Sequence, residues 1–211
     1  MANDHIVFIV DDDRRIRESL TELLSSYEML AVAFSTAAEY LAYPLPDVPA
    51  CVILDVQLPD INGLELQRRI AHGYHPHIVF ITGHGDIPSS VRAIKAGAVD
   101  FLSKPFQAAD LMRAVNAALE QNREARRVRA DLSELTRRFS TLTRREQDVL
   151  PLIASGLLNK QAAAELGISG ITLQIHRGKI MKKMHAGSLA ELVRMAAMLE
   201  IPVVDSRRSR Q

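Results

Sequence analysis

The sequence predicts two domains: an α/β domain with a doubly wound, parallel (βα)5 sheet, and a smaller all-α domain after it. Short apolar runs alternate with amphipathic segments along the first 120 residues, the pattern of successive βα units. From residue 141 onward, apolar residues recur only at helical spacing. The charge also changes sign, because residues 1–120 hold 9 Lys+Arg against 16 Asp+Glu, whereas residues 121–211 hold 17 against 9.

The composition indicates a cytoplasmic protein with two small hydrophobic cores. Of the 211 residues, 47% are hydrophobic, and no apolar run approaches the roughly 20 residues of a membrane span. The single cysteine, Cys51, excludes a disulfide framework and fits a reducing compartment. The chain begins without the basic segment of a signal peptide. We therefore expect no contact with a membrane.

The predicted strands are runs of β-branched and other apolar residues that end at polar residues. The run at 52–55 has no alternation of apolar and polar residues, which is typical of a strand buried on both faces. Ser35 and Asp86 are expected to cap the second and fourth helices. The predicted strands are 5–10, 29–34, 52–55, 77–82 and 99–103. The first helix is predicted from Ile16, Leu20, Leu23 and Leu24, which recur at helical spacing. The later helices are predicted over 35–43, 64–72, 87–96 and from 107 to beyond 123.

Polar side chains stand at the ends of four of these strands. The carboxyl ends of parallel strands meet at one edge of a sheet, where open α/β sheets bind ligands. We therefore expect these groups to converge. They are Asp11 and Asp12 after the first strand, Asp55 at the third, Thr82 at the fourth and Lys104 after the fifth.

Crowded carboxylates repel one another, and a hard divalent cation relieves that repulsion. Mg²⁺, or Mn²⁺ in its place, takes oxygen ligands. The predicted ligands are Asp12, Asp55 and the backbone carbonyl of Gln57, with Asp11 acting through water. Asp55 is the predicted nucleophile that accepts a phosphoryl group as an acyl phosphate. The Lys104 ammonium would neutralise charge on the transferred oxygens, and the Thr82 hydroxyl would donate a hydrogen bond to one of them.

Each of these residues alone has a simpler interpretation. An aspartate after a strand is more often a turn former or helix cap than a nucleophile, and Asp13 is expected to be such a cap. Lys104 beside a proline is compatible with an ordinary surface charge, and Thr82 with a loop cap. Their joint occurrence at the strand ends of one sheet favours a shared site.

Four motifs resemble the receiver domain of bacterial two-component response regulators. They are the acid pair at 11–12, LDVQLPDINGLEL around Asp55, ITGHGD with Thr82 and SKPF with Lys104. The resemblance covers residues 4–121 and implies a flavodoxin-like fold. It also implies that a sensor histidine kinase phosphorylates Asp55 with Mg²⁺ bound.

The same resemblance implies that Thr82 and Phe101 switch conformation together. Such a protein is not an enzyme in the usual sense, since it catalyses at most its own phosphorylation from a phosphodonor and its own dephosphorylation. Gln57 stands where many receivers carry Arg or Met. The resemblance implies that only the backbone carbonyl of this residue binds the metal, so the different side chain is expected to leave metal binding intact.

The second half of the chain has the pattern of a helix-turn-helix. Residues 122–140 are rich in charged helix formers and lack Gly and Pro, which predicts a helical linker that extends the last helix of the first domain. Capping boxes are predicted at Thr143 with Glu146 and at Ser188 with Glu191. Between them lie a short helix over 159–166, a turn at 167–169 and a longer helix over 171–184.

The longer helix carries most of the residues expected to contact DNA. Its first turns would enter the major groove, where Gln can bond adenine and Thr can meet a thymine methyl, while its basic residues would contact phosphates. The expected contacts are Thr172, Gln174, His176, Arg177, Lys179, Lys182 and Lys183, with Lys160 from the shorter helix. Apolar contacts are expected from Ile171, Ile175, Ile180 and Met184, and in part from Leu173.

The segment LTRREQDVLPLIASGLLNKQAAAELGISGITLQIHRGKIMKKM resembles the LuxR-type helix-turn-helix, a four-helix domain. The whole chain then resembles the NarL/FixJ family of transcriptional regulators. The resemblance implies that phosphorylation favours a homodimer, which places two recognition helices on palindromic double-stranded DNA; RNA polymerase is a further expected partner. The expected domains are a receiver at 1–121, a helical linker at 122–140, a DNA-binding domain at 141–205 and a flexible tail at 206–211.

Two other function classes remain open at this point. One is a small phosphatase or phosphotransferase that uses Asp55 on a diffusible substrate, which turnover of small phosphate esters would reveal. The other is a phosphosignalling module that docks a protein partner through its basic helices instead of binding DNA. Binding to DNA that weakens steeply as salt rises would separate a DNA-binding regulator from such a module.

Overall fold

The computed structural model describes residues 4–70, 75–83 and 87–202, and the chain divides into two units, Met1–Arg126 and Arg127–Gln211. The expected cap Asp86 and the expected tail at 206–211 lie outside the described residues. Within those ranges, no helix combines the length and the apolar character needed to cross a membrane.

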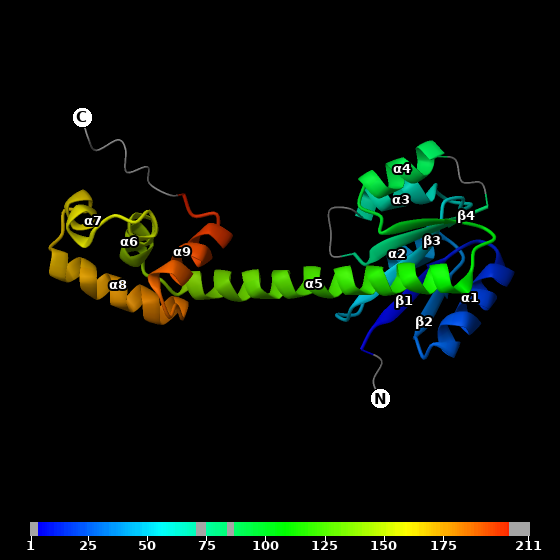
Figure 1. Cartoon of the computed structure of the whole chain (residues 1–211), viewed down its shortest axis with the longest axis horizontal. Coiled ribbons are helices and arrows are strands. Elements are labelled where there is room, and N and C mark those ends of the chain that lie inside the picture. Colours follow the sequence, from blue (N-terminus) through cyan, green and yellow to red (C-terminus); the bar gives the residue numbers. More distant parts are fainter. Residues whose placement is uncertain (1–3, 71–74, 84–86, 203–211) are drawn as a thin grey trace. The chain divides into compact units, whose positions relative to one another are not determined.

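The first unit is built on a parallel sheet of five strands in the order β2-β1-β3-β4-β5 (Figure 1). The strands are β1 Ile6–Val10, β2 Ala31–Phe34, β3 Ala50–Asp55, β4 His77–Thr82 and β5 Asp100–Ser103. Every residue of β1 and β3 is buried, as expected for strands covered on both faces. The predicted doubly wound, flavodoxin-like sheet is therefore confirmed.

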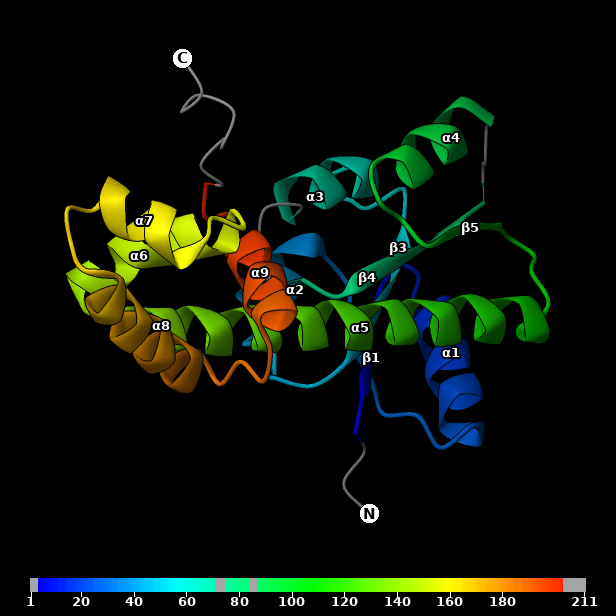
Figure 2. The ribbon, with the colours of Figure 1, turned by 60° about the vertical axis from the view of Figure 1, so that its left-hand side comes forward.

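Helices cover both faces of this sheet, and Figure 2 shows α3 and α4 on one side of the strands and α1 on the other. One core cluster holds Phe8, Phe34, Tyr40, Leu66 and Ala93, from β1, β2, α2, α3 and α4. The other holds Ile9, Leu24, Ile53, Leu111 and Val115, from β1, α1, β3 and α5. The helices are α1 Arg14–Ser26, α2 Ala37–Ala42, α3 Gly63–Ile70, α4 Ile87–Lys95 and α5 Ala108–Ser140. Successive residues of each strand point to opposite faces, so both clusters draw on the same strands.

The cap of α2 lies one residue later than expected. Thr36, not Ser35, has the extended backbone of an N-cap, and its hydroxyl accepts from the Glu39 backbone N–H at 3.1 Å. The Glu39 carboxylate in turn accepts from the backbone N–H of Ser35 at 2.8 Å. Ser35 thus helps to begin the helix through its backbone, while its neighbour supplies the capping oxygen.

Helix α5 continues without interruption through residues 122–140, as expected for a linker that extends the last helix of the first domain. Asn122 anchors this helix to the sheet. The Asn122 side chain is buried, and its Oδ1 accepts from the backbone N–H of Ala50 at 3.0 Å. Its Nδ2 lies 3.3 Å from Nδ1 of His77. One turn further, Arg126 forms an ion pair with Asp47. These contacts set the position of α5 along the edge of the sheet where β3 and β4 begin.

The second unit packs four helices against the end of α5. They are α6 Arg144–Ala154, α7 Asn159–Glu165, α8 Gly170–Met184 and α9 Leu189–Met198. Gly167 takes a left-handed φ of +63° in the turn between α7 and α8, and Ser169 caps α8 by accepting from the Thr172 backbone N–H. The predicted capping box of Thr143 and Glu146 is present. The order of short helix, turn and longer helix is the predicted helix-turn-helix.

Two details of the second unit differ from the expectation. Ser188 caps α9 through the Glu191 backbone N–H, but the Glu191 carboxylate accepts from Gly187 instead of Ser188, so only half of the expected capping box forms. On α8, Leu173, Ile180 and Met184 are buried, whereas Ile171 and Ile175 are exposed. Only one stripe of a helix can face a core, and residues at 173, 180 and 184 occupy it.

We predict that Asn122→Ala destabilises the first unit by about 1–3 kcal/mol, because it leaves the buried Ala50 N–H without its acceptor. Urea unfolding of the full chain measures this loss. Asn116→Ala is the matched control, since Asn116 is exposed on the same helix and gains the same helix propensity. Equal unfolding free energies for the two variants would contradict the anchoring role of Asn122.

Candidate functional site

Three carboxylates converge at the carboxyl edge of the sheet. Oxygen atoms of Asp11, Asp12 and Asp55 all lie within 4.8 Å of one another, although Asp55 follows Asp12 by 43 positions in the sequence. Asp11 and Asp55 are buried and Asp12 is exposed. The strand order explains the meeting, because β1 and β3 are neighbours and pair through Val10 and Leu54, next to the acids.

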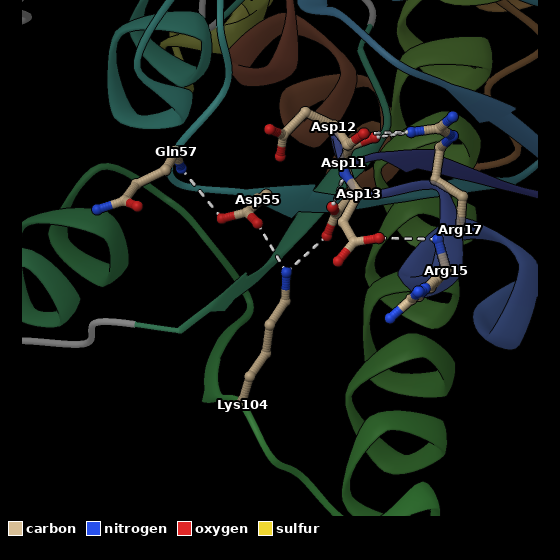
Figure 3. Close-up of polar contacts among 8 residues, drawn as sticks. All are labelled: Asp11, Asp12, Asp13, Arg15, Arg17, Asp55, Gln57 and Lys104. Atoms are coloured by element: carbon tan, nitrogen blue, oxygen red, sulfur yellow. Dashed lines mark hydrogen bonds and ion pairs between the residues drawn. The ribbon is translucent and has the colours of Figure 1, made fainter.

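Lys104 reaches into this cluster from the end of β5. Its Nζ donates to Asp11 Oδ2 at 2.6 Å and to Asp55 Oδ2 at 2.7 Å (Figure 3). The backbone N–H of Lys104 donates to the carbonyl of Thr82 at 2.7 Å, which continues the pairing of β4 with β5 and fixes where the side chain starts. In Figure 3 the ammonium lies between the two buried carboxylates, on the other side of them from the Asp12 side chain.

The charges in the pocket depend on one another. Burial raises the pKa of Asp11, and the hydrogen bonds from Lys104 and from the Asp13 backbone oppose that rise. Burial by itself would lower the pKa of Lys104, but its hydrogen bonds to Asp11 and Asp55 outweigh burial and raise it. The lysine therefore stays charged, and it compensates two largely buried carboxylates.

The loop that carries Asp11 and Asp12 is held from two sides. The guanidinium of Arg17 donates to the backbone carbonyls of Asp11 and Asp12 at 2.7 and 2.8 Å (Figure 3). Asp13 caps α1 as predicted, accepting from the Arg15 backbone N–H at 2.8 Å. Arg17 was not among the residues predicted from the sequence. The signal available for it was its position in the first turn of α1, five residues after Asp12 and six after Asp11.

The loop after β3 orients Asp55. The backbone N–H of Gln57 donates to Asp55 Oδ1 at 3.0 Å, and Gln57 bridges to Asn62 across the loop. Gly63 closes the turn, since its N–H donates to the carbonyl of Val56 at 2.8 Å and a Cβ there would lie 2.4 Å from the Asp55 carbonyl oxygen. Only glycine allows this approach.

Asp60, which the sequence analysis did not single out, ties the same loop to α2. Its carboxylate accepts from the backbone N–H groups of Ala37 and Ala38, the first residues of that helix, at 3.3 and 2.9 Å. A carboxylate at a helix N-terminus is favourable, and these hydrogen bonds help to lower the pKa of Asp60 against the opposing effect of burial. Asp60, at the end of the LPD segment of the sequence, is therefore a structural contact.

Thr82 and Phe101 lie on the adjacent strands β4 and β5. Thr82 is buried at the end of β4, beside the pocket that Lys104 enters. The ring of Phe101 is half-buried, with its centroid 6.0 Å from that of Phe80. Both residues are placed on the strands predicted for them, and Phe101 lies outside the fully buried core.

In the second unit, the residues expected to contact DNA, apart from Lys183, fall into two groups. Gln174, Lys179 and Lys182 are exposed on α8, and Lys160 is exposed on α7. Thr172, His176 and Arg177 are half-buried at the edge of the helix. Thr172 Oγ1 lies 2.8 Å from Ser169 Oγ, and Arg177 donates to Asn159 Oδ1 at 3.1 Å, which joins α8 to α7.

Lys183 forms hydrogen bonds within the domain, whereas a contact with a DNA phosphate was expected for it. Its Nζ donates to Glu146 Oε2 at 2.6 Å and to the carbonyl of Thr141 at 3.0 Å, so it connects α8 to the start of α6. Glu146 is buried, which would raise its pKa, but the hydrogen bonds from Lys183 and Thr143 outweigh burial and lower it. The lysine compensates a buried carboxylate that the sequence presents only as half of a capping box.

A parallel sheet that gathers carboxylates and a lysine at one edge, followed by a helix-turn-helix, defines the class of response regulators. The family described as the response regulator receiver domain matches residues 7–116, and the luxR family of bacterial regulatory proteins matches residues 140–196. The chain belongs to the NarL/FixJ family of response regulators. It is a DNA-binding transcriptional regulator of a two-component system.

Similar proteins share both halves of the chain. Nodulation protein W of Bradyrhizobium diazoefficiens is 52% identical over 197 residues, which cover 93% of this chain and 87% of that protein. Transcriptional regulatory protein FixJ of Azorhizobium caulinodans is 42% identical over 94% of this chain and 95% of its own length. The solved structure of the response regulator StyR is 44% identical, with a TM-score of 0.79 over 92% of this chain and 98% of that one.

We predict that Gly63→Ala lowers the unfolding free energy by about 1–3 kcal/mol, because the added Cβ would collide with the Asp55 carbonyl oxygen. Thermal or urea unfolding measures the loss. Gly83→Ala is the control, since a Cβ at Gly83 meets nothing within 4 Å. If Gly63→Ala were no less stable than Gly83→Ala, the close approach at Gly63 would not constrain the loop.

We also predict that Lys183→Met and Lys182→Met separate a structural role from a DNA contact. Lys183→Met leaves Glu146 buried without its cation and lowers stability by about 1–3 kcal/mol. Lys182 is exposed, so Lys182→Met is expected to keep the stability and to weaken DNA binding. Chemical unfolding and fluorescence anisotropy with duplex DNA measure the two effects. If instead Lys183→Met kept the stability and weakened DNA binding, Lys183 would belong to the surface that contacts DNA.

Proposed function

We propose that Asp55 is the phosphoacceptor of this regulator and that a sensor histidine kinase supplies the phosphoryl group. In this transfer a carboxylate oxygen of Asp55 bonds to phosphorus, the bond from phosphorus to the kinase imidazole breaks, and the imidazole keeps the electron pair. The observation that carries the proposal is the Lys104 ammonium, 2.7 Å from Asp55 Oδ2. From there it can neutralise charge on the transferred oxygens, and the Thr82 hydroxyl on the neighbouring strand end can donate to one of them.

The carboxylates at this edge fit a hard divalent cation. Their oxygens come within 4.8 Å of one another, and the exposure of Asp12 leaves room for the waters that Mg²⁺ retains. We assign Asp12, Asp55 and the backbone carbonyl of Gln57 as direct ligands of Mg²⁺ or Mn²⁺, with Asp11 acting through water. The bound ion would supply positive charge to the phosphoryl oxygens during transfer.

Phosphorylation is then expected to change the face formed by α4 and β5. Phe101 supports this proposal, because a half-buried ring can change its exposure without opening the buried core. We propose that Thr82 and Phe101 move together and favour a homodimer, which would place two α8 helices on a palindromic site. RNA polymerase is the further partner that we propose for the regulator, and the cytoplasm is its proposed location.

The proposed function also assigns a role to each segment of the chain. We propose a receiver at 1–121, a helical linker at 122–140, a DNA-binding domain at 141–205 and a tail at 206–211. The exposure of Gln174 on α8 supports a contact with a base, and the exposed Lys160, Lys179 and Lys182 suit phosphates. Thr172, His176 and Arg177 lie at the edge of this surface, whereas Lys183 is assigned to the Glu146 pair.

We predict that acetyl phosphate with Mg²⁺ phosphorylates the wild-type chain and raises its affinity for DNA, and that Asp55→Asn abolishes both effects. Intact mass spectrometry follows phosphorylation, and fluorescence anisotropy follows DNA binding. Asp12→Asn is expected to slow phosphorylation by about tenfold or more, because it removes a proposed metal ligand. Chelation of Mg²⁺ with EDTA should have a similar effect on the wild type.

Asp60→Asn is the matched control for the phosphoacceptor. It makes the same chemical change in the same loop, but Asp60 contacts the start of α2 and is not expected to be phosphorylated. Phosphorylation of Asp55→Asn at the wild-type rate would overturn the assignment. DNA affinity that does not fall as salt rises would instead favour a protein-docking module over a DNA-binding surface.

A further inference from the structure

Two isoleucines on α8 are exposed one helical turn apart. Ile171 is 76% exposed and Ile175 is 54% exposed, whereas the apolar residues on the opposite stripe of the helix are fully buried. Gln174 and Lys179 share the exposed face with them. Single exposed apolar residues are common on protein surfaces. Here two isoleucines are exposed on successive turns of α8, the helix that carries most of the proposed DNA contacts. This arrangement indicates that a binding partner covers them.

Internal hydrogen bonds reduce the number of polar groups on α8 that are available to read bases. The Thr172 hydroxyl is paired with Ser169, a nitrogen of Arg177 with Asn159, and Lys183 with Glu146. The outward face at the start of the helix therefore presents Gln174 between Ile171 and Ile175. Its chemistry is one amide flanked by two branched aliphatic side chains.

The charges around the pair favour a polyanion as the partner. α8 contains no Asp or Glu, and the exposed residues that follow the isoleucines along the helix include Lys179 and Lys182. Gly178 lies on the same face, and a Cβ there would meet nothing within 4 Å, so the backbone is open to a close approach. An apolar protein partner would not require this concentration of positive charge.

We propose that Ile171 and Ile175 determine sequence specificity by contacting thymine methyl groups in the major groove. Residues one turn apart are separated by about 6 Å along a helix, close to two base-pair steps of about 3.4 Å. A thymine methyl is the apolar group that the major groove presents, and Gln174 can bond the adenine of such a pair. The preferred half-site would therefore contain neighbouring A·T pairs. This inference rests on the proposed function, because it requires that α8 bind DNA.

The test begins by selecting preferred sites from random duplexes with the full-length chain, phosphorylated by acetyl phosphate in Mg²⁺. Each thymine of the selected half-site is then replaced by deoxyuridine, which removes only the methyl group. We expect one or two positions at which the wild-type affinity falls about fourfold per methyl, the value for one buried methyl group. Fluorescence anisotropy at fixed salt measures each affinity.

The same duplexes are then titrated with Ile171→Ala and Ile175→Ala. Each variant is expected to bind the thymine duplex more weakly than the wild type and to respond less than twofold to deoxyuridine at its own position. Met198→Ala is the matched control, since Met198 is an exposed apolar residue on α9, and it should respond to deoxyuridine as the wild type does. All three side chains are exposed, so thermal unfolding should show no loss of stability.

The outcomes distinguish the inference from the proposed function. Deoxyuridine effects that are absent in the wild type, or unchanged in both isoleucine variants, would overturn the inference while DNA binding stands. Variants that bind DNA normally but lose transcription with RNA polymerase in vitro would show that the pair contacts protein. If the wild type enriched no sequence at all, the proposed function would fail and this inference with it.

Discussion

The pair of hydrogen-bonded ion pairs made by Lys104 is the interaction on which the receiver site depends. Its ammonium lies 2.6 Å from one buried carboxylate oxygen, of Asp11, and 2.7 Å from another, of Asp55. Without a cation these groups would repel each other, and burial raises the pKa of Asp11 against the opposing hydrogen bond from Lys104. Lys104 therefore holds the two carboxylates together at this edge of the sheet.

The topology of the sheet makes this interaction possible. Lys104 and Asp11 are 93 residues apart in the chain, yet β1, β3, β4 and β5 are consecutive neighbours in the sheet. Parallel pairing aligns their carboxyl ends, and short loops project from that edge. Arg17 and Gly63 then set the two loops, the first by binding carbonyls and the second by leaving space. Backbone geometry thus positions every proposed ligand of the cation.

In the helix-turn-helix unit, a lysine again compensates a buried carboxylate. Glu146 is buried at the start of α6, and Lys183 from the end of α8 compensates it. This contact couples α8 to α6, the helix that precedes the helix-turn-helix. The remaining exposed cations of α8 stay available for phosphates, while its first turns present Ile171, Gln174 and Ile175. One face of the helix thus stabilises the domain, and the other faces outward.

Local patterns in the sequence determined the strands, the helix caps at Asp13, Thr143 and Ser188, and the strand-end positions of the acids, the threonine and the lysine. Periodicity and capping act over a few residues, so a single sequence contains them. Only the tertiary structure decided which side of each helix meets a core and which distant group each side chain meets. It turned Lys183 toward Glu146, exposed Ile171 and Ile175, and brought Asn122 to the start of β3. These outcomes depend on neighbours far along the chain, because burial leaves room for one stripe of each helix and demands a partner for every buried polar group.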